Sequence, residues 1–220
     1  MKISNDLIKN DVPAEGQISD CVSFNMTENA ELKIAFLGNS ITRHGVAEEL
    51  GWFGDWGMAA SCRENDYVHK LISRIKKRVS YCVANLSGWE RSRDMSLLER
   101  DYAAVKSFGA DIVVVRLGEN ARLAESLEEF KPCYKEMVAY FAGNAKVVLT
   151  DLFWEYEPFD GFVKNFSEEE GFAFVTLHDL GGNPEMKAVG KFAHAGVAAH
   201  PSDRGMAEIA ERSYKKLCNI

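Results

Sequence analysis

The chain alternates short apolar runs with longer segments of helical periodicity, and this alternation predicts an α/β fold with a parallel sheet. Two of the runs, residues 33–37 and 111–117, are almost continuously apolar, which is typical of strands covered by helices on both faces. The 220 residues are 46% hydrophobic, enough for one well-buried domain. We therefore expect a single-domain, three-layer α/β/α sandwich.

The elements follow in order along the chain. Residues 1–31 are polar and mixed, and we interpret them as an N-terminal arm with one short strand around residues 18–24, ahead of a main domain at residues 32–220. The expected strands of the domain are residues 33–37, 81–84, 111–117, 146–152 and 173–177. The expected helices are residues 67–78, 96–108, 127–141, 158–170 and 202–217. Right-handed βαβ connections then favour the flavodoxin-like strand order 2-1-3-4-5.

Composition restricts the partners. A net charge of −7 and a pI near 5.3 argue against a nucleic-acid partner. No apolar run is long enough to span a bilayer, and no signal peptide is visible, so we expect no membrane partner. The five cysteines are scattered, as reduced thiols of a cytoplasmic protein would be. Neither metal-ligand spacing nor Gly-x-Gly-x-x-Gly occurs, so no cofactor is expected, and the oligomeric state stays open.

A serine and a histidine are predicted to meet at one edge of the sheet. Gly38-Asn39-Ser40 follows the first strand of the domain, and His200 lies in a loop, restricted by Pro201, before the last helix. Because ligands of such folds bind at the carboxyl ends of the strands, Ser40 is a candidate nucleophile and His200 its candidate base. A simple turn or N-cap serine is the alternative for Ser40. Four other histidines are less well placed, His178 being the best rival: His44, His69, His178 and His194.

Three blocks carry a family resemblance. Gly38-Asn39-Ser40 resembles the Gly-Asp-Ser signature of the SGNH (GDSL-type) hydrolases, Gly118-Glu119-Asn120 resembles their Gly-x-Asn block, and His200-Pro201 resembles their C-terminal His-Pro. The blocks occur in family order, and the resemblance covers roughly residues 32–217. It implies ester hydrolysis by Ser40 and His200. It also implies an oxyanion hole formed by the Asn120 side chain and a backbone N–H after the second strand, best matched by Gly88.

Two positions depart from the family pattern. Asn39 replaces the usual Asp, and its carbonyl oxygen can keep the role of a hydrogen-bond acceptor. Val197 stands where the family has its catalytic acid, three residues before the histidine. Losing the triad carboxylate costs about 10⁴ in turnover in a serine protease. Three alternatives remain: His200 donates to a backbone carbonyl in a Ser–His dyad, the site is inactive, or another carboxylate substitutes, from Asp203, Asp179 or Glu119.

Aromatic and basic residues gather in the same loops. The four tryptophans each follow a strand end, so they predict an aromatic-walled cleft for substrate: Trp52, Trp56, Trp89 and Trp154. Their alternative role is to plug loops against the core. Arginines in these loops predict contacts with an anionic or polyhydroxyl substrate, Arg43 first: Arg43, Arg91, Arg93 and Arg122. Arg116 lies inside a buried strand and needs a partner, for which Glu90 is the leading candidate.

Together these features predict a serine esterase that cleaves an O-acyl, possibly acetyl, group from a carbohydrate or another small molecule. A non-catalytic carbohydrate- or ligand-binding module on the same fold is the first alternative, because of Val197. A phosphate or nucleotide binder that uses residues 38–42 at a helix N-terminus is the second. Turnover of a short-chain aryl ester distinguishes the enzyme from the first alternative, and Ser40 facing His200 argues against the second.

Overall fold

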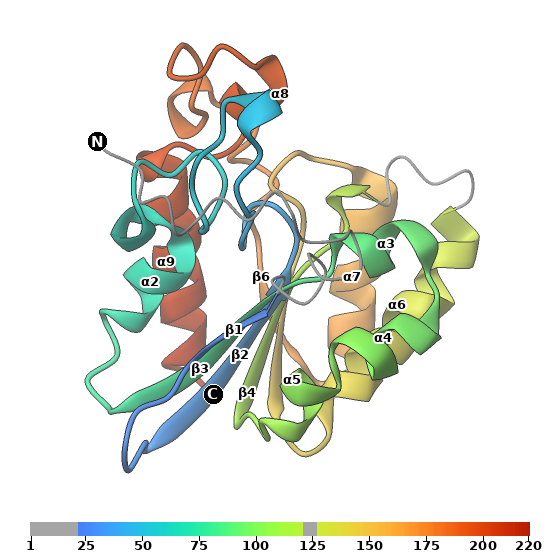
Figure 1. Ribbon diagram of the computed structural model, residues 1–220. Helices are drawn as coiled ribbons and strands as arrows, with labels where there is room; N and C mark the ends of the chain where they lie inside the picture. Colours follow the sequence, from blue (N-terminus) through green and yellow to red (C-terminus); the bar gives the residue numbers. More distant parts are fainter. Residues whose placement is uncertain (1–21, 121–126) are drawn as a thin grey trace.

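The computed structural model describes residues 22–120 and 127–220, which form a six-stranded sheet in the order β1-β3-β2-β4-β5-β6 (Figure 1). The strands are β1 (Val22–Asn25), β2 (Leu32–Gly38), β3 (Val79–Asn85), β4 (Ile112–Arg116), β5 (Lys146–Thr150) and β6 (Ala173–Val175). Strands β2 to β6 are parallel and follow the expected 2-1-3-4-5 order, so the predicted fold class is confirmed.

Strand β1 adds a sixth member to this arrangement, because it pairs antiparallel with β3 at the edge of the sheet. The strand expected around residues 18–24 overlaps it, but residues 18–21 lie outside the described residues, as does Arg122. The division of the chain after residue 31 stays a prediction, although β1 contributes to the sheet from within the expected arm.

The helices are α2 (Tyr67–Ile72), α3 (Ser87–Ser92), α4 (Met95–Asp101), α5 (Ala103–Ser107), α6 (Leu127–Ala142), α7 (Glu157–Glu170), α8 (Ala195–Ala198) and α9 (Asp203–Leu217). Short 3₁₀ turns are η3 (Glu48–Leu50), η4 (Arg63–Asn65) and η6 (Pro184–Met186). The single helix expected over residues 96–108 is wrong. It is divided at Tyr102, whose backbone leaves the helical region (φ −124°, ψ 10°) and whose buried hydroxyl donates to the Asn85 carbonyl at 2.6 Å.

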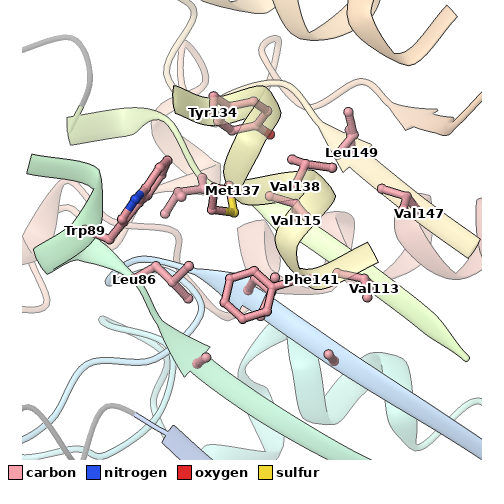
Figure 2. Packing of buried hydrophobic residues seen from close by; sticks show 14 of the residues in the cluster. Leu86, Trp89, Val113, Val115, Tyr134, Met137, Val138, Phe141, Val147 and Leu149 are labelled. Atoms are coloured by element: carbon pink, nitrogen blue, oxygen red, sulfur yellow. The ribbon is translucent and has the colours of Figure 1, made fainter. Parts of the chain in front are cut away.

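Side chains alternate between the two faces of the sheet, as a strand period of two requires. Ile34 and Phe36 of β2 pack with α2 and α9, whereas Ala35 and Leu37 pack with the helices of the other layer, α3 to α7. Figure 1 shows α2 and α9 together on one side of the sheet and α4, α5, α6 and α7 on the other. In Figure 2, Met137 and Val138 of α6 lie over Val115 of β4, in the larger of the two cores. Both cores leave the carboxyl edge of the sheet to the loops.

Gly38 shapes the loop that follows β2. A Cβ added there would lie 1.9 Å from Thr42 Oγ1 and 2.7 Å from the Arg116 carbonyl oxygen, so only glycine fits. The close approach lets the loop turn at once, with the N–H groups of Thr42 and Arg43 donating to the Asn39 carbonyl at 2.9 and 3.0 Å. Ser40 is held within this turn, at the carboxyl edge of the sheet.

We expect Gly38→Ala to destabilise the protein, because the new methyl group must displace Thr42 or the β4 backbone. Overpacking of this kind lowers the free energy of unfolding by about 1–3 kcal/mol. Urea unfolding followed by circular dichroism measures the change. Gly182→Ala is the matched control, since a Cβ at Gly182 meets nothing within 4 Å. Equal unfolding midpoints for the two variants would contradict the steric role of Gly38.

Candidate active site

Ser40 and His200 form a hydrogen-bonded pair at the carboxyl edge of the sheet. Ser40 Oγ lies 2.8 Å from His200 Nε2, and His200 Nδ1 lies 2.7 Å from the Gly196 carbonyl oxygen. A carbonyl oxygen only accepts, so Nδ1 carries the proton and Nε2 is left to accept from the Ser40 hydroxyl. This is the tautomer that a general base for Ser40 requires.

The backbone around His200 is fixed on both sides. The His200 N–H donates to the Val197 carbonyl at 3.0 Å, and its own carbonyl accepts from the Ala188 N–H at 2.9 Å. Two residues later, Ser202 caps α9, its Oγ accepting from the Gly205 N–H at 3.4 Å. The position of the imidazole is therefore set by the Ser202 cap of α9 on one side and by the backbone of α8, which includes Gly196, on the other.

Burial lowers the pKa of His200 to about 4, and the neighbouring Arg116 and His44 act in the same direction, while the hydrogen bond to Gly196 opposes them. Trp154 contributes to this burial, because its ring meets the His200 ring edge-on with centroids 5.5 Å apart. A ring with this pKa is neutral, and therefore able to accept a proton, at any pH well above 4.

The Gly196 carbonyl orients His200, and no carboxylate of the described residues is bonded to its ring. Val197 is 1% exposed and packs into a small apolar cluster with Trp52 and Met58. The three proposed substitutes are engaged elsewhere. Asp203 accepts from the Ser61 N–H and hydroxyl, Asp179 pairs with Arg212, and Glu119 pairs with Arg116. The arrangement in the structure is therefore the first of the three alternatives, in which His200 pairs with Ser40 and donates to a backbone carbonyl.

Arg116 is buried at the end of β4, and its partner differs from the expected one. Its Nη2 forms an ion pair with Glu119, and its Nη1 donates to Asn39 Oδ1 at 3.2 Å. The prediction of Glu90 is wrong. The Glu90 carboxylate turns instead to the backbone N–H groups of Gly118 and Asn120, at 2.7 and 2.9 Å. Burial lowers the pKa of Arg116 to about 10, which the neighbouring Glu90 charge opposes.

Asn39 uses both ends of its amide in a way that an aspartate could not. Its Oδ1 accepts from Arg116, and its Nδ2 donates to Glu119 Oε2 at 2.7 Å and to Glu90 Oε2 at 3.4 Å. An aspartate could accept but not donate, and it would be a third carboxylate in a buried cluster with one guanidinium. We call these four side chains the buried polar cluster: Asn39, Glu90, Arg116 and Glu119.

Asn120 is held at the edge of the cleft by Glu90. Its Nδ2 donates to Glu90 Oε2 at 2.5 Å, which uses one of the two amide hydrogens and leaves the second for a ligand. Burial raises the pKa of Glu90, and the hydrogen bonds from Asn120, Gly118 and Asn39 oppose that effect.

Backbone donors are also available near Ser40. Within the described residues, the Ser40 N–H makes no hydrogen bond. Gly88 lies in the first turn of α3, where N–H groups have no acceptor within the helix. Ser87 rather than Gly88 lines the cleft, and its N–H already donates to Asn85 Oδ1 at 2.8 Å. A part for Gly88 in an oxyanion hole stays a prediction.

A cleft of about 270 Å³ opens over the Ser40 hydroxyl. Its walls combine polar side chains with an apolar part formed by Leu50, Met58 and Val197. The described residues that line it are Ser40, His44, Leu50, Met58, Ser87, Arg91, Asn120, His194, Gly196, Val197 and His200.

The expected aromatic wall is not built as predicted. Trp89 is fully buried and packs on Phe130 in the larger core, with ring centroids 5.9 Å apart, and Trp52 is 2% exposed within the cluster that holds Val197. Both are structural plugs, because large apolar rings gain more from burial under a loop than from exposure at a cleft. Trp154 touches His200 but does not line the cleft described above.

Trp56 and Arg43 line a second hollow of about 70 Å³, away from Ser40. The Arg43 guanidinium donates to Asp55 at 2.9 and 3.1 Å, and the Trp56 indole donates to the Ala60 carbonyl. Their assignment as substrate contacts at the cleft is therefore wrong. The ion pair with Asp55 keeps Arg43 in its own loop.

The other histidines have different partners. His178 Nδ1 lies 2.7 Å from Asp151, which raises the pKa of His178, and His69 pairs with Asp66. His194 caps α8, its Nδ1 accepting from the Val197 N–H at 3.3 Å. His200 is thus the histidine bonded to Ser40. The sequence could not indicate the Gly196 carbonyl, because side-chain patterns carry no information about one backbone carbonyl. It could have indicated the ion pair of Arg116 with Glu119, which are three residues apart.

Within residues 22–120 and 127–220, no cluster of three or more histidine, cysteine, aspartate or glutamate side chains could hold a metal ion. In the same part of the chain, no helix combines the length and the hydrophobicity needed to cross a membrane.

No known family matches the sequence, and no curated protein matches it either. Solved structures do. The fold is similar to that of a variant of an acetyl xylan esterase from Geobacillus stearothermophilus, with a TM-score of 0.58 and 19% identity over 86% of this chain and 95% of that one. It is also similar to a family 3 carbohydrate esterase from Clostridium thermocellum, with a TM-score of 0.57 and 14% identity over 86% and 96% of the two chains.

A lipolytic protein of the G-D-S-L family from Desulfitobacterium hafniense matches with a TM-score of 0.54 and 16% identity, over 84% of this chain and 99% of that chain. At such identities the likeness concerns the fold. The chain has the α/β/α fold of the SGNH hydrolases, and the resemblance inferred from its three sequence blocks is confirmed at that level.

We expect Asn39→Asp to destabilise the protein. The change removes the amide donor shared by Glu90 and Glu119 and adds a third carboxylate beside Arg116. A buried group that loses its hydrogen-bond partner costs about 1–3 kcal/mol, and more when it is charged. Crowded carboxylates have raised pKa values, so protonation relieves the repulsion and the stability loss should shrink as pH falls from 8 to 5.

Thermal unfolding across that pH range tests this expectation. Asn165→Asp is the control, because it makes the same chemical change on the exposed surface of α7. A loss of stability in Asn39→Asp no larger than in Asn165→Asp at pH 8 would show that the cluster tolerates another charge.

Proposed function

We propose that this protein is a serine esterase that removes a short acyl group, most simply acetyl, from a carbohydrate. The observation that carries the proposal is the contact between Ser40 Oγ and a neutral imidazole at 2.8 Å, with the far nitrogen of that imidazole donating to the Gly196 carbonyl. A serine paired with a base in this way is an activated nucleophile.

In the first step, Ser40 Oγ attacks the acyl carbon and its proton passes to His200 Nε2. The carbonyl oxygen of the substrate gains negative charge, which the free amide hydrogen of Asn120 and the Ser40 N–H can stabilise. His200 then gives the proton to the departing sugar oxygen, and an acyl-Ser40 remains. In the second step, water attacks the acyl carbon as one of its protons passes to His200 Nε2. The bond between the acyl carbon and Ser40 Oγ then breaks, His200 returns the proton to Oγ, and the acid leaves.

Replacing a triad carboxylate by a carbonyl has a defined consequence. The Gly196 carbonyl fixes the tautomer and the ring plane of His200, which is the orienting part of the carboxylate's work. It brings no full negative charge to stabilise the imidazolium, and burial keeps the pKa of His200 low although the hydrogen bond to Gly196 opposes it. We therefore expect a functional but slower site than one with a complete triad.

The substrate class rests on the comparisons and on the cleft. Two of the similar structures are carbohydrate esterases by name. The cleft has polar side chains beside an apolar part formed by Leu50, Met58 and Val197, and its volume of about 270 Å³ limits the length of the acyl chain that it can take. These features support a small acyl group on a polyhydroxyl alcohol over a long-chain lipid ester.

We expect Ser40→Ala to abolish hydrolysis of short acyl esters without changing the fold. His200→Ala should be nearly as inactive, because the two residues act as a unit. Asn120→Ala should lose about 10²–10³ in kcat, the effect of one oxyanion donor. Release of 4-nitrophenol from the acetate and acetate release from acetylated xylose measure these rates. Ser73→Ala, at the exposed end of α2, is the control.

A serine-directed organophosphonate should label Ser40 in the parent protein and leave Ser40→Ala unlabelled. The proposal fails when the parent and Ser40→Ala hydrolyse every tested ester at one background rate and neither is labelled. Saturable sugar binding without turnover would then favour the binding module.

The pH dependence of kcat/KM reports on the free His200. Because the pKa of His200 is lowered to about 4, the ring stays an unprotonated base throughout the mildly acidic range. We expect kcat/KM for 4-nitrophenyl acetate to fall only as pH drops toward 4, rather than around 6.5, the ordinary value for histidine. An acidic limb with a midpoint above 6 would contradict this assignment of the base.

A further inference from the structure

The charge of the cleft differs in sign from that of the protein. The chain carries a net charge of −7, yet none of the described residues lining the cleft is Asp or Glu. Arg91 is the lining residue that carries a fixed charge, and it is positive. A surface of opposite sign in an acidic protein concentrates anions and weakens as salt rises.

Arg91 is the fixed positive charge of this surface. It is exposed on α3, its guanidinium has one long contact, Nη2 to Asn120 Oδ1 at 3.5 Å, and it forms no ion pair with the described residues. Its neighbour Glu90 is 1% exposed and turned into the buried polar cluster. Arg93, two residues on, has Glu129 within 4.0 Å. Most of the five N–H donors of Arg91 are thus available to a ligand.

His194 adds a second donor. Because its Nδ1 accepts from the Val197 N–H, the proton of the neutral ring is on Nε2. The ring is exposed and lines the cleft, so Nε2–H can donate to a ligand whether or not the ring is charged. An arginine fork with a nearby N–H donor is a typical arrangement for binding a carboxylate.

We propose that the cleft selects acylated sugars that carry a carboxylate, such as O-acetylated uronic acid residues, and that Arg91 and His194 bind that carboxylate. This inference rests on the proposed function and specifies its substrate. Asn120, the candidate oxyanion donor, lies beside Arg91. A sugar that carries both groups can therefore place its ester at Asn120 and its carboxylate at Arg91. An acyl sugar without the carboxylate leaves Arg91 without its ligand.

The test compares three substrates that differ at one carbon. They are methyl glucuronoside, its neutral glucuronamide and methyl glucoside, each acetylated at the same hydroxyl group, and acetate release gives kcat/KM. For the parent protein we expect about a 10- to 100-fold preference for the glucuronoside over the glucuronamide, the range of a charge-assisted hydrogen bond. The preference should decrease between 20 and 500 mM salt.

In Arg91→Gln the ratio of kcat/KM for the glucuronoside to kcat/KM for the glucuronamide should fall below about threefold, because the loss is concentrated on the substrate that carries the carboxylate. In His194→Gln it should decrease partly, because one donor of several is changed. Lys77→Gln is the control: it removes the same charge from an exposed residue in the loop before β3, at the opposite end of the sheet. It should retain the preference.

The outcomes separate the two proposals. Equal kcat/KM for the three sugars in the parent overturns the carboxylate site and leaves the esterase intact. An equal loss for all three sugars in Arg91→Gln also overturns it, since Arg91 would then act on the shared tetrahedral intermediate or on Asn120. No acetate from any sugar, no 4-nitrophenol and no organophosphonate labelling of Ser40 overturn the esterase and the carboxylate site together.

Discussion

The buried ion pair between Arg116 and Glu119 is the contact on which the geometry of the candidate site depends. A guanidinium at the end of a covered strand must be neutralised and hydrogen-bonded, and Glu119 and Asn39 do both. Asn39 directly precedes Ser40. Glu119 also accepts from the Phe153 N–H at 3.3 Å, and the next residue, Trp154, packs on the His200 ring. Because the buried Arg116 needs these partners, the loops after β2, β4 and β5 are held together. The first of these loops carries Ser40, and the last carries Trp154, which packs on His200.

The hydrogen bond from His200 to the Gly196 carbonyl separates two tasks that a triad carboxylate combines. Orientation needs only an acceptor in the right place, and a backbone held by α8 supplies one. Stabilisation of the imidazolium needs negative charge, and no carboxylate of the described residues is bonded to His200. Burial lowers the pKa of His200, and the hydrogen bond to the Gly196 carbonyl only partly opposes it. A weaker base removes the Ser40 proton less readily, but it remains unprotonated over a wider range of acidic pH.

The fold and the meeting of Ser40 with His200 could be predicted because both follow from topology. Alternating strands and helices give a parallel sheet, and the carboxyl ends of parallel strands share an edge. Side-chain direction does not follow from position after a strand. Trp89 was therefore expected in the cleft and lies in the core, and Arg116 was assigned to Glu90 although Glu119 was three residues away. The Gly196 carbonyl could not be found at all, since every residue carries one.

The two departures from the SGNH pattern have the same electrostatic sign. Asn39 and Val197 each stand where the family resemblance implies an aspartate, so each removes one negative charge from the surroundings of Ser40. The carboxylates that remain close by, Glu90 and Glu119, are turned into the buried cluster that contains Arg116. Among the described residues that line this cleft there is no Asp or Glu, and there is one exposed guanidinium, that of Arg91. Under the proposed function, a valine at position 197 leaves His200 without a carboxylate that would make it a stronger base, but it also leaves out a negative charge that would repel an anionic sugar beside His200. The same position would then slow the chemistry and favour the proposed class of substrate.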